Sequence, residues 1–159
     1  ESGPEAMSKL ELKIPPIGVF LLFAAAMWLT AASTAGHAFN DTFRFTFAAL
    51  ATAASAVFGI GGLLSFRKAR TTVNPFTPDD SSELVTGGVY RFSRNPMYLA
   101  LLLLLLALGL ALSNLYSLAL ALLFVPYMNR FQIRPEERAM EKVFGEAFEC
   151  YRKKVRRWV

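Results

Sequence analysis

An almost uninterrupted apolar run from Pro96 to Val125 constrains this chain more than any other feature of its sequence. The run is too long for one membrane span, because a helix crosses the hydrocarbon core with about 20 residues. The polar pair Ser113–Asn114 divides the run and favours a tight hairpin of two helices, near 96–112 and 115–129. Each helix would be at most about 26 Å long, which is only just enough to cross a bilayer.

Two further uncharged segments, 14–36 and 45–66, also have the length of a membrane span. The chain is 54% hydrophobic, which is too apolar for an ordinary soluble domain. We therefore predict an all-α integral membrane protein with four transmembrane helices, forming a single membrane domain over residues 7–159. Residues 1–6 precede Met7 and are interpreted as an expression remnant.

Basic residues are distributed unevenly along the chain. With four spans, sixteen of the seventeen Lys and Arg residues fall on one side of the membrane, and only Arg44 falls on the other. Cytoplasmic loops carry an excess of Lys and Arg. We therefore predict cytoplasmic termini, a cytoplasmic loop at 67–95 and location in the inner (plasma) membrane of a bacterium. An odd number of spans would scatter the basic residues over both sides.

The segment 135–158 has an apolar stripe rather than a continuous apolar run. Pro135 suits the first turn of a helix, and the acids after it complement the positive end of the helix dipole. We predict one amphipathic helix over 135–158 that lies along the cytoplasmic surface, with its basic end near anionic lipid headgroups. The stripe consists of Met140, Val143, Phe144, Ala147, Phe148, Tyr151, Val155 and Trp158.

Charged residues gather where the predicted membrane helices meet the cytoplasm. Arg91 and Arg94 precede the pair Asn95–Pro96, which predicts a capped helix start with free N–H groups that can bind an anion. The hairpin returns the acids Glu136 and Glu137 to the same level. We expect a pocket with a cationic wall and an acidic wall. In the alternative interpretation, the arginines only anchor the helix at the lipid surface and the asparagine only caps it.

The sequence lacks other common catalytic and metal-binding motifs. The single cysteine, Cys150, and the single histidine, His37, are isolated, and neither zinc-ligand spacing nor a phosphate-binding loop occurs. We therefore expect no metal. We expect the basic residues behind the net charge of +5 to face the membrane surface, and we expect no nucleic-acid partner.

Two stretches, GGVYRFSRNPMYLA (87–100) and PEERAMEKVFGEAFECYRKKVRRW (135–158), resemble the isoprenylcysteine carboxyl methyltransferase and phospholipid methyltransferase superfamily of integral membrane enzymes. That family has an Arg-His-Pro-x-Tyr element that opens a membrane helix. A Glu-Glu pair follows the next helix, and Phe-Gly, spaced tyrosines and a basic stretch come after it. The resemblance covers the chain from the LVTGG stretch onward. Asn95 stands where many relatives have histidine, and Phe148 where they often have tyrosine.

The resemblance implies methyl transfer from S-adenosylmethionine to a lipophilic acceptor at the cytoplasmic membrane face. The acceptor would be a prenylcysteine-like carboxylate, a lipid amine or a thiol. The cofactor would bind under the C-terminal helix without a Rossmann domain. Asn95 is assigned to cofactor binding only, because an amide cannot act as a base. By the same resemblance the cofactor site would contain Tyr90, Arg91, Arg94, Asn95, Pro96, Tyr98, Glu136 and Glu137.

The remaining predicted roles concern the reaction and the acceptor. One of the glutamates is predicted to take a proton from an amine acceptor, and Arg130 or Arg134 to orient an anionic acceptor; Glu137 and Arg134 are the predicted catalytic residues. Arg130 and Asn129 are the predicted acceptor-binding residues. Two alternatives stay open: a membrane reductase that binds a nicotinamide cofactor, and a non-catalytic scaffold whose basic face holds anionic lipid.

Overall fold

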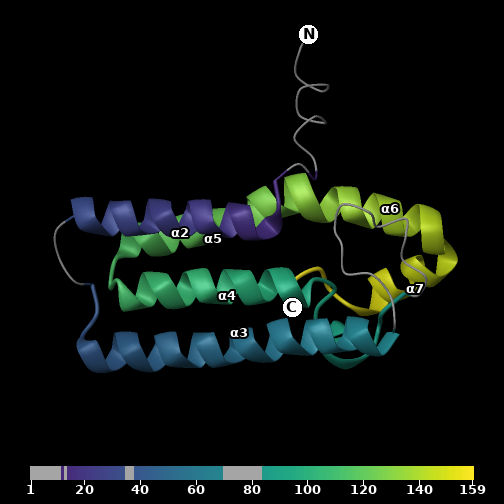
Figure 1. The fold of residues 1–159 in the computed structure, drawn as a ribbon, viewed down its shortest axis with the longest axis horizontal. Coiled ribbons are helices and arrows are strands. Elements are labelled where there is room, and N and C mark those ends of the chain that lie inside the picture. Colours follow the sequence, from purple (N-terminus) through teal and green to yellow (C-terminus); the bar gives the residue numbers. More distant parts are fainter. Residues whose placement is uncertain (1–11, 13, 35–37, 70–83) are drawn as a thin grey trace, which may run out of the picture.

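The computed structural model describes residues 12, 14–34, 38–69 and 84–159, and every regular element in these ranges is helical. Four helices lie antiparallel, side by side, and they coincide with the four predicted apolar segments (Figure 1). The predicted remnant at 1–6 and residues 70–83 of the predicted loop lie outside the described residues. The four helices are α2 (Pro16–Ser33), α3 (Asp41–Ala69), α4 (Pro96–Ala111) and α5 (Leu115–Met128).

The lengths and surfaces of these helices fit a membrane protein. α2 and α3, with 18 and 29 residues, are long and apolar enough to cross a bilayer, whereas α4 is a shorter apolar helix of 16 residues. Large apolar side chains remain exposed on their outer faces, and apolar surfaces of this extent mark a membrane or a partner. The all-α class is confirmed for the described residues, and four spans with cytoplasmic termini stay a prediction.

The core lies between α2, α4 and α5, while α3 packs on α4. Small residues bring α3 close to α4, and the Ser55 hydroxyl donates a hydrogen bond to the Ala100 carbonyl over 2.8 Å. At Gly62 an added Cβ would lie 2.9 Å from Met97 Cγ, so a side chain there would require Met97 to move. The side chains that are fully buried in the core include Met27 of α2, Leu105 of α4 and Phe124 and Met128 of α5.

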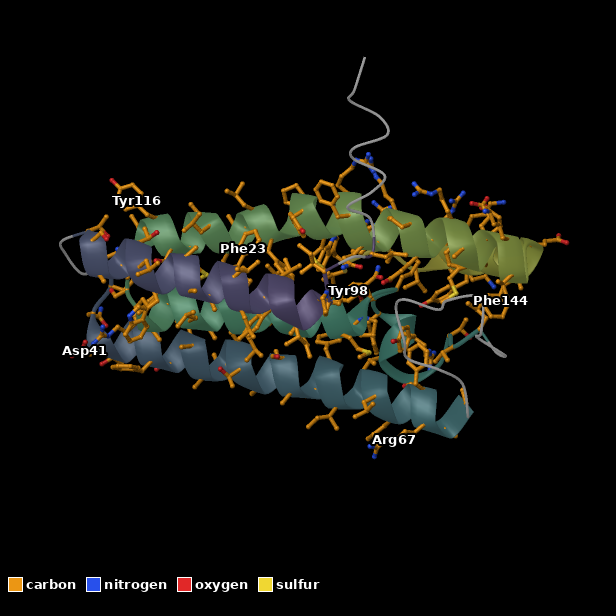
Figure 2. The ribbon with its side chains drawn as sticks, turned by 45° about the horizontal axis from the view of Figure 1, so that its top comes forward. Phe23, Asp41, Arg67, Tyr98, Tyr116 and Phe144 are labelled. Carbon is orange, nitrogen blue, oxygen red and sulfur yellow. The ribbon has the colours of Figure 1, made fainter. Side chains whose placement is uncertain are left out.

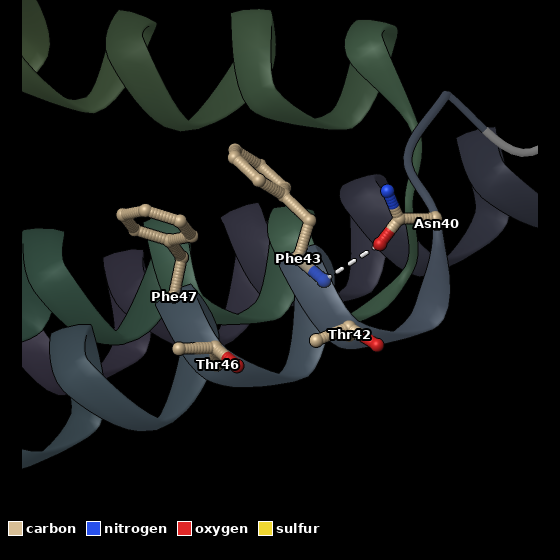
Figure 3. Close-up of a pocket in the computed structure, with 5 residues that line it drawn as sticks. All are labelled: Asn40, Thr42, Phe43, Thr46 and Phe47. Atoms are coloured by element: carbon tan, nitrogen blue, oxygen red, sulfur yellow. Dashed lines mark hydrogen bonds between the residues drawn. The ribbon is translucent and has the colours of Figure 1, made fainter.

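The predicted break at Ser113–Asn114 is where the hairpin turns. The Asn114 side chain accepts a hydrogen bond from the Ser117 N–H over 2.9 Å and thereby caps α5. Its amide also donates to the Thr34 hydroxyl over 2.6 Å, which ties the hairpin to the end of α2. At this same end of the bundle, a shallow groove at the start of α3 is lined by Asn40, Thr42, Phe43, Thr46 and Phe47 (Figure 3).

The prediction of one continuous helix over 135–158 is wrong. Two helices, α6 (Arg134–Phe144) and α7 (Glu146–Lys154), meet at Gly145, whose φ of +50° is a conformation that L side chains rarely adopt. α6 continues the direction of α5 away from the bundle, and α7 turns back (Figure 1). The predicted single helix along the membrane surface is therefore replaced by a helical hairpin beyond the bundle end.

A π-helical turn, η3 (Asn129–Ile133), joins α5 to α6 without a break. Pro135 lacks an N–H, so it cannot donate to the carbonyl of Phe131 four residues earlier. That carbonyl instead accepts a hydrogen bond from the Leu12 N–H over 3.1 Å. The Gln132 amide donates to the Ile14 carbonyl over 2.6 Å. Leu12 and Ile14 thus dock on the π-helical turn.

Candidate functional site

A charged cluster lies at the bundle end where α4 begins and α6 emerges. The Glu137 carboxylate accepts from two arginines that are far apart in the sequence. Arg94 Nη2 lies 3.1 Å from Glu137 Oε1, and Arg157 Nε and Nη2 lie 3.1 Å and 2.5 Å from Oε1 and Oε2. The side chains of Arg94 and Glu137 are 10% and 13% exposed, whereas that of Arg157 is 30% exposed. A partly buried ion-pair triad therefore closes this end of the fold.

The start of α4 differs from the predicted capped helix. The Asn95 side chain does not cap α4 but donates to the Arg157 carbonyl over 2.9 Å. The Asn95 N–H is satisfied by the Ser93 hydroxyl at 3.1 Å, and Pro96 at the first helical position is buried. Because no side chain among the described residues caps α4, its first N–H groups can still donate to an anion.

Arg94 is the most buried cation of this cluster. Its Nε and Nη1 atoms are buried and have no hydrogen-bond partner among the described residues. Burial lowers the pKa of the Arg94 guanidinium from its usual value, and the Glu137 carboxylate opposes that shift. A buried guanidinium with two open donors is costly unless an acceptor pairs with it, and a carboxylate has the geometry to do so.

Glu136 has a different environment from Glu137. The Tyr98 hydroxyl of α4 donates to the Glu136 carboxyl, and Tyr98 lies between the helices (Figure 2). Burial raises the pKa of Glu136 to about 8, the hydrogen bond from Tyr98 opposes the shift, and the charge of Glu137 adds to it. The two neighbouring acids thus have different surroundings: Glu137 lies between two arginines, and Glu136 is buried beside a tyrosine with a pKa of about 8.

This raised pKa predicts how stability depends on pH. The folded chain keeps a proton on Glu136 that the unfolded chain releases near its ordinary pKa of 4.5. Stability from this group is therefore greatest below about pH 4.5 and is lost as pH rises through about 8. In detergent, the melting temperature of the wild type should fall over that range, and Glu136→Gln should flatten the decline. Glu146→Gln, at the exposed start of α7, is the control that keeps the slope; equal slopes in all three would contradict the prediction.

Tyr90 lies behind the charged cluster, in a short 3₁₀ turn, η2 (Gly88–Arg91). It is buried with Phe148 and Tyr151, and the Tyr151 hydroxyl donates to the Tyr90 carbonyl over 2.7 Å. Burial raises the pKa of both tyrosines. The pair therefore packs α7 against η2, three residues before Arg94.

The other predicted site residues are spread over two environments. Arg91 and Arg134 are exposed and take no part in the ion pairs around Glu137. Arg130 is half-buried, 5.7 Å from the Phe131 ring centre. Asn129 accepts a hydrogen bond from Trp158 Nε1 over 3.0 Å. Of the predicted residues, the structure therefore groups Arg94, Asn95, Pro96, Tyr98, Glu136 and Glu137 at one place.

Arg157 and Trp158 are the members of this cluster that sequence reasoning missed. The predicted single helix over 135–158 includes both residues and would direct them away from α4. The signal was present at Gly145, since a glycine inside a helical pattern also marks a helix end. A break there allows residues 155–159 to return to the bundle.

Comparisons with known proteins cover most of this region. The family model for phospholipid methyltransferases matches residues 43–147. An uncharacterized protein of Haemophilus influenzae (strain ATCC 51907 / DSM 11121 / KW20 / Rd) is 44% identical over 63 residues, which are 40% of this chain and 100% of that protein. No solved structure matches the chain. The family match includes Arg94, Tyr98 and the Glu136–Glu137 pair but ends before Arg157.

Proposed function

The chain belongs to the phospholipid methyltransferase family, within the isoprenylcysteine carboxyl methyltransferase-like superfamily, and we propose that it transfers a methyl group from S-adenosylmethionine to a lipophilic acceptor. Membership of the family indicates membrane methyltransferase activity. The use of S-adenosylmethionine and the kind of acceptor are the further parts of the proposal.

The observation that carries the proposal is the pair of unpartnered buried nitrogens on Arg94, beside the uncapped start of α4. The amino-acid end of S-adenosylmethionine carries a carboxylate, to which both the Arg94 guanidinium and the first N–H groups of α4 can donate. A guanidinium and a helix start together bind a carboxylate well, because the charge and the N–H directions both favour it.

The acidic wall suits the rest of the same ligand. Glu136 and Glu137 are adjacent in the first turn of α6 and can accept hydrogen bonds from an ammonium group or from ribose hydroxyls. The described residues therefore fit a zwitterion, with its carboxylate toward Arg94 and its ammonium toward the glutamates. When bound, S-adenosylmethionine supplies an activated methyl group. The task of the protein is then to hold the two reactants in line.

Proton handling favours Glu136 over the predicted Glu137. Glu137 is occupied by two guanidinium groups, which compete for its lone pairs. Glu136 has a pKa of about 8 and a tyrosine partner, so it can exchange a proton near neutral pH. With an amine acceptor, the deprotonated form of Glu136, which predominates above about pH 8, would take the proton released from nitrogen. A carboxylate or thiolate acceptor would need no such base. Arg130 and Asn129 remain the proposed contacts of the acceptor.

Ligand-induced stabilisation in detergent tests this function. S-adenosylhomocysteine, the product form of the cofactor, should raise the melting temperature of the wild type, because a ligand that binds only the folded state stabilises it. NADPH at the same concentration should have no effect. Stabilisation by NADPH alone would indicate a reductase-like protein, and stabilisation by neither would indicate a non-catalytic lipid-binding scaffold.

A further inference from the structure

Residues 155–159, here called the strap, leave α7 and return across the charged cluster to the start of α4, where Figure 1 marks the end of the chain. The Arg94 N–H donates to the Arg156 carbonyl over 3.0 Å. The Asn95 amide donates to the Arg157 carbonyl over 2.9 Å. Two backbone carbonyls of the strap therefore accept hydrogen bonds from Arg94 and Asn95, just before α4.

Side chains of the strap form hydrogen bonds with two more of the proposed site residues. The Arg157 guanidinium forms two hydrogen bonds to the Glu137 carboxylate, at 3.1 Å and 2.5 Å. Trp158 donates to Asn129 over 3.0 Å. The strap thus contacts residues assigned to the cofactor side and a residue assigned to the acceptor side of the same site.

We propose that the strap is an autoinhibitory closure, in which Arg157 holds Glu137 in place of the ligand and must leave before S-adenosylmethionine binds. This inference rests on the proposed function. Glu137 Oε1 is ion-paired with Arg94 and accepts a hydrogen bond from Arg157, and Oε2 accepts another from Arg157. Its carboxylate therefore has little capacity left for an ammonium or hydroxyl group of a ligand while the strap is in place.

The contacts of the strap suit a segment that opens and closes. Arg157 is 30% exposed, Arg156 is exposed, and Val159 is 69% exposed. Val155 and Trp158 pack against the two apolar clusters, and the rest of the strap is held by accessible ion pairs and hydrogen bonds, so local opening costs less than global unfolding. If only a fraction of molecules is open, the apparent dissociation constant equals the intrinsic one divided by that fraction. Weakening the strap should therefore tighten ligand binding.

Substitution of Arg157 tests the closure. Titration calorimetry of S-adenosylhomocysteine in detergent should give a dissociation constant for Arg157→Ala about three- to tenfold lower than for the wild type. Arg156→Ala is the matched control, because it removes a neighbouring exposed cation that contributes only its backbone carbonyl to the closure. Its affinity should equal that of the wild type. Unchanged or weaker binding by Arg157→Ala would overturn the proposal.

Tryptophan fluorescence provides a second measurement that needs no change in the strap. The chain has two tryptophans, and Trp28 is 61% exposed on α2. In Trp28→Phe, Trp158 is the only reporter, and its emission should shift as saturating S-adenosylhomocysteine releases it from Asn129. Binding seen by calorimetry without a change in emission would contradict release of the strap.

The two proposals fail in distinguishable ways. Loss of binding in Arg94→Ala together with no tightening in Arg157→Ala would retain the methyltransferase site and overturn the closure. If S-adenosylhomocysteine binds to neither the wild type nor Arg157→Ala, both proposals are overturned.

Discussion

Arg94→Ala should weaken the binding of S-adenosylhomocysteine by roughly 100-fold or more. Truncating one partner of a buried, hydrogen-bonded charge pair costs about 2–5 kcal/mol, and each 1.4 kcal/mol is a factor of about ten. The substitution removes the two open donors proposed for the carboxylate of the ligand and leaves Glu137 with Arg157 alone. Titration calorimetry in detergent measures the change directly.

Arg91→Ala is the matched control for this prediction. Arg91 lies three residues earlier, at the end of η2, but it is exposed. A surface substitution of this kind usually changes a free energy by no more than about 0.5 kcal/mol. Affinity should therefore stay within about threefold of the wild type. Equal losses in both variants would mean that general positive charge at the membrane face, rather than the Arg94 site, governs binding.

Gly109→Val should have the largest effect on the fold. A Cβ at Gly109 would lie 2.7 Å from Leu118 Cδ2, 3.0 Å from its Cγ and 3.3 Å from its Cα. The last of these atoms belongs to the backbone of α5, so rotation of the leucine side chain cannot relieve the clash. Overpacking of this kind costs about 1–3 kcal/mol and occasionally more. The melting temperature in detergent should fall by roughly 10 °C, or the variant should not yield folded protein.

Gly59→Val provides the comparison on another helix. A Cβ at Gly59 meets only Ala100 Cβ, at 3.4 Å, and the position is half-buried. The added methyl groups can turn toward the exposed side of α3. This variant should therefore melt close to the wild type. A greater loss for Gly59→Val than for Gly109→Val would contradict the close approach of α4 and α5.

The helices of the bundle were predictable because each depends on local sequence. Uncharged runs long enough to span a membrane, and the polar pair Ser113–Asn114 between two of them, place α2 to α5 almost where the structure has them. The break at Gly145 was not predictable from the same pattern, because Phe148 and Tyr151 continue the apolar spacing beyond it. Those two residues pack with Tyr90 only after the chain has turned back.

The charged cluster was predictable in part. A hairpin of two helices returns Glu137 to the level of Arg94, and the structure joins their side chains over 3.1 Å. The role of these residues in binding stays a prediction. Arg157 and the amide of Asn95 depend on the path of the strap, which is set by tertiary contacts that no local spacing records.

Methyl transfer itself tests the central claim most directly. The wild type and Arg94→Ala should be incubated with methyl-labelled S-adenosylmethionine and a native lipid extract supplemented with prenylcysteine and thiol acceptors. We expect a labelled product with the wild type that Arg94→Ala reduces by roughly 100-fold, whereas Arg91→Ala retains it. Absence of labelled product from the lipid, prenylcysteine and thiol fractions with folded wild-type protein would contradict the account.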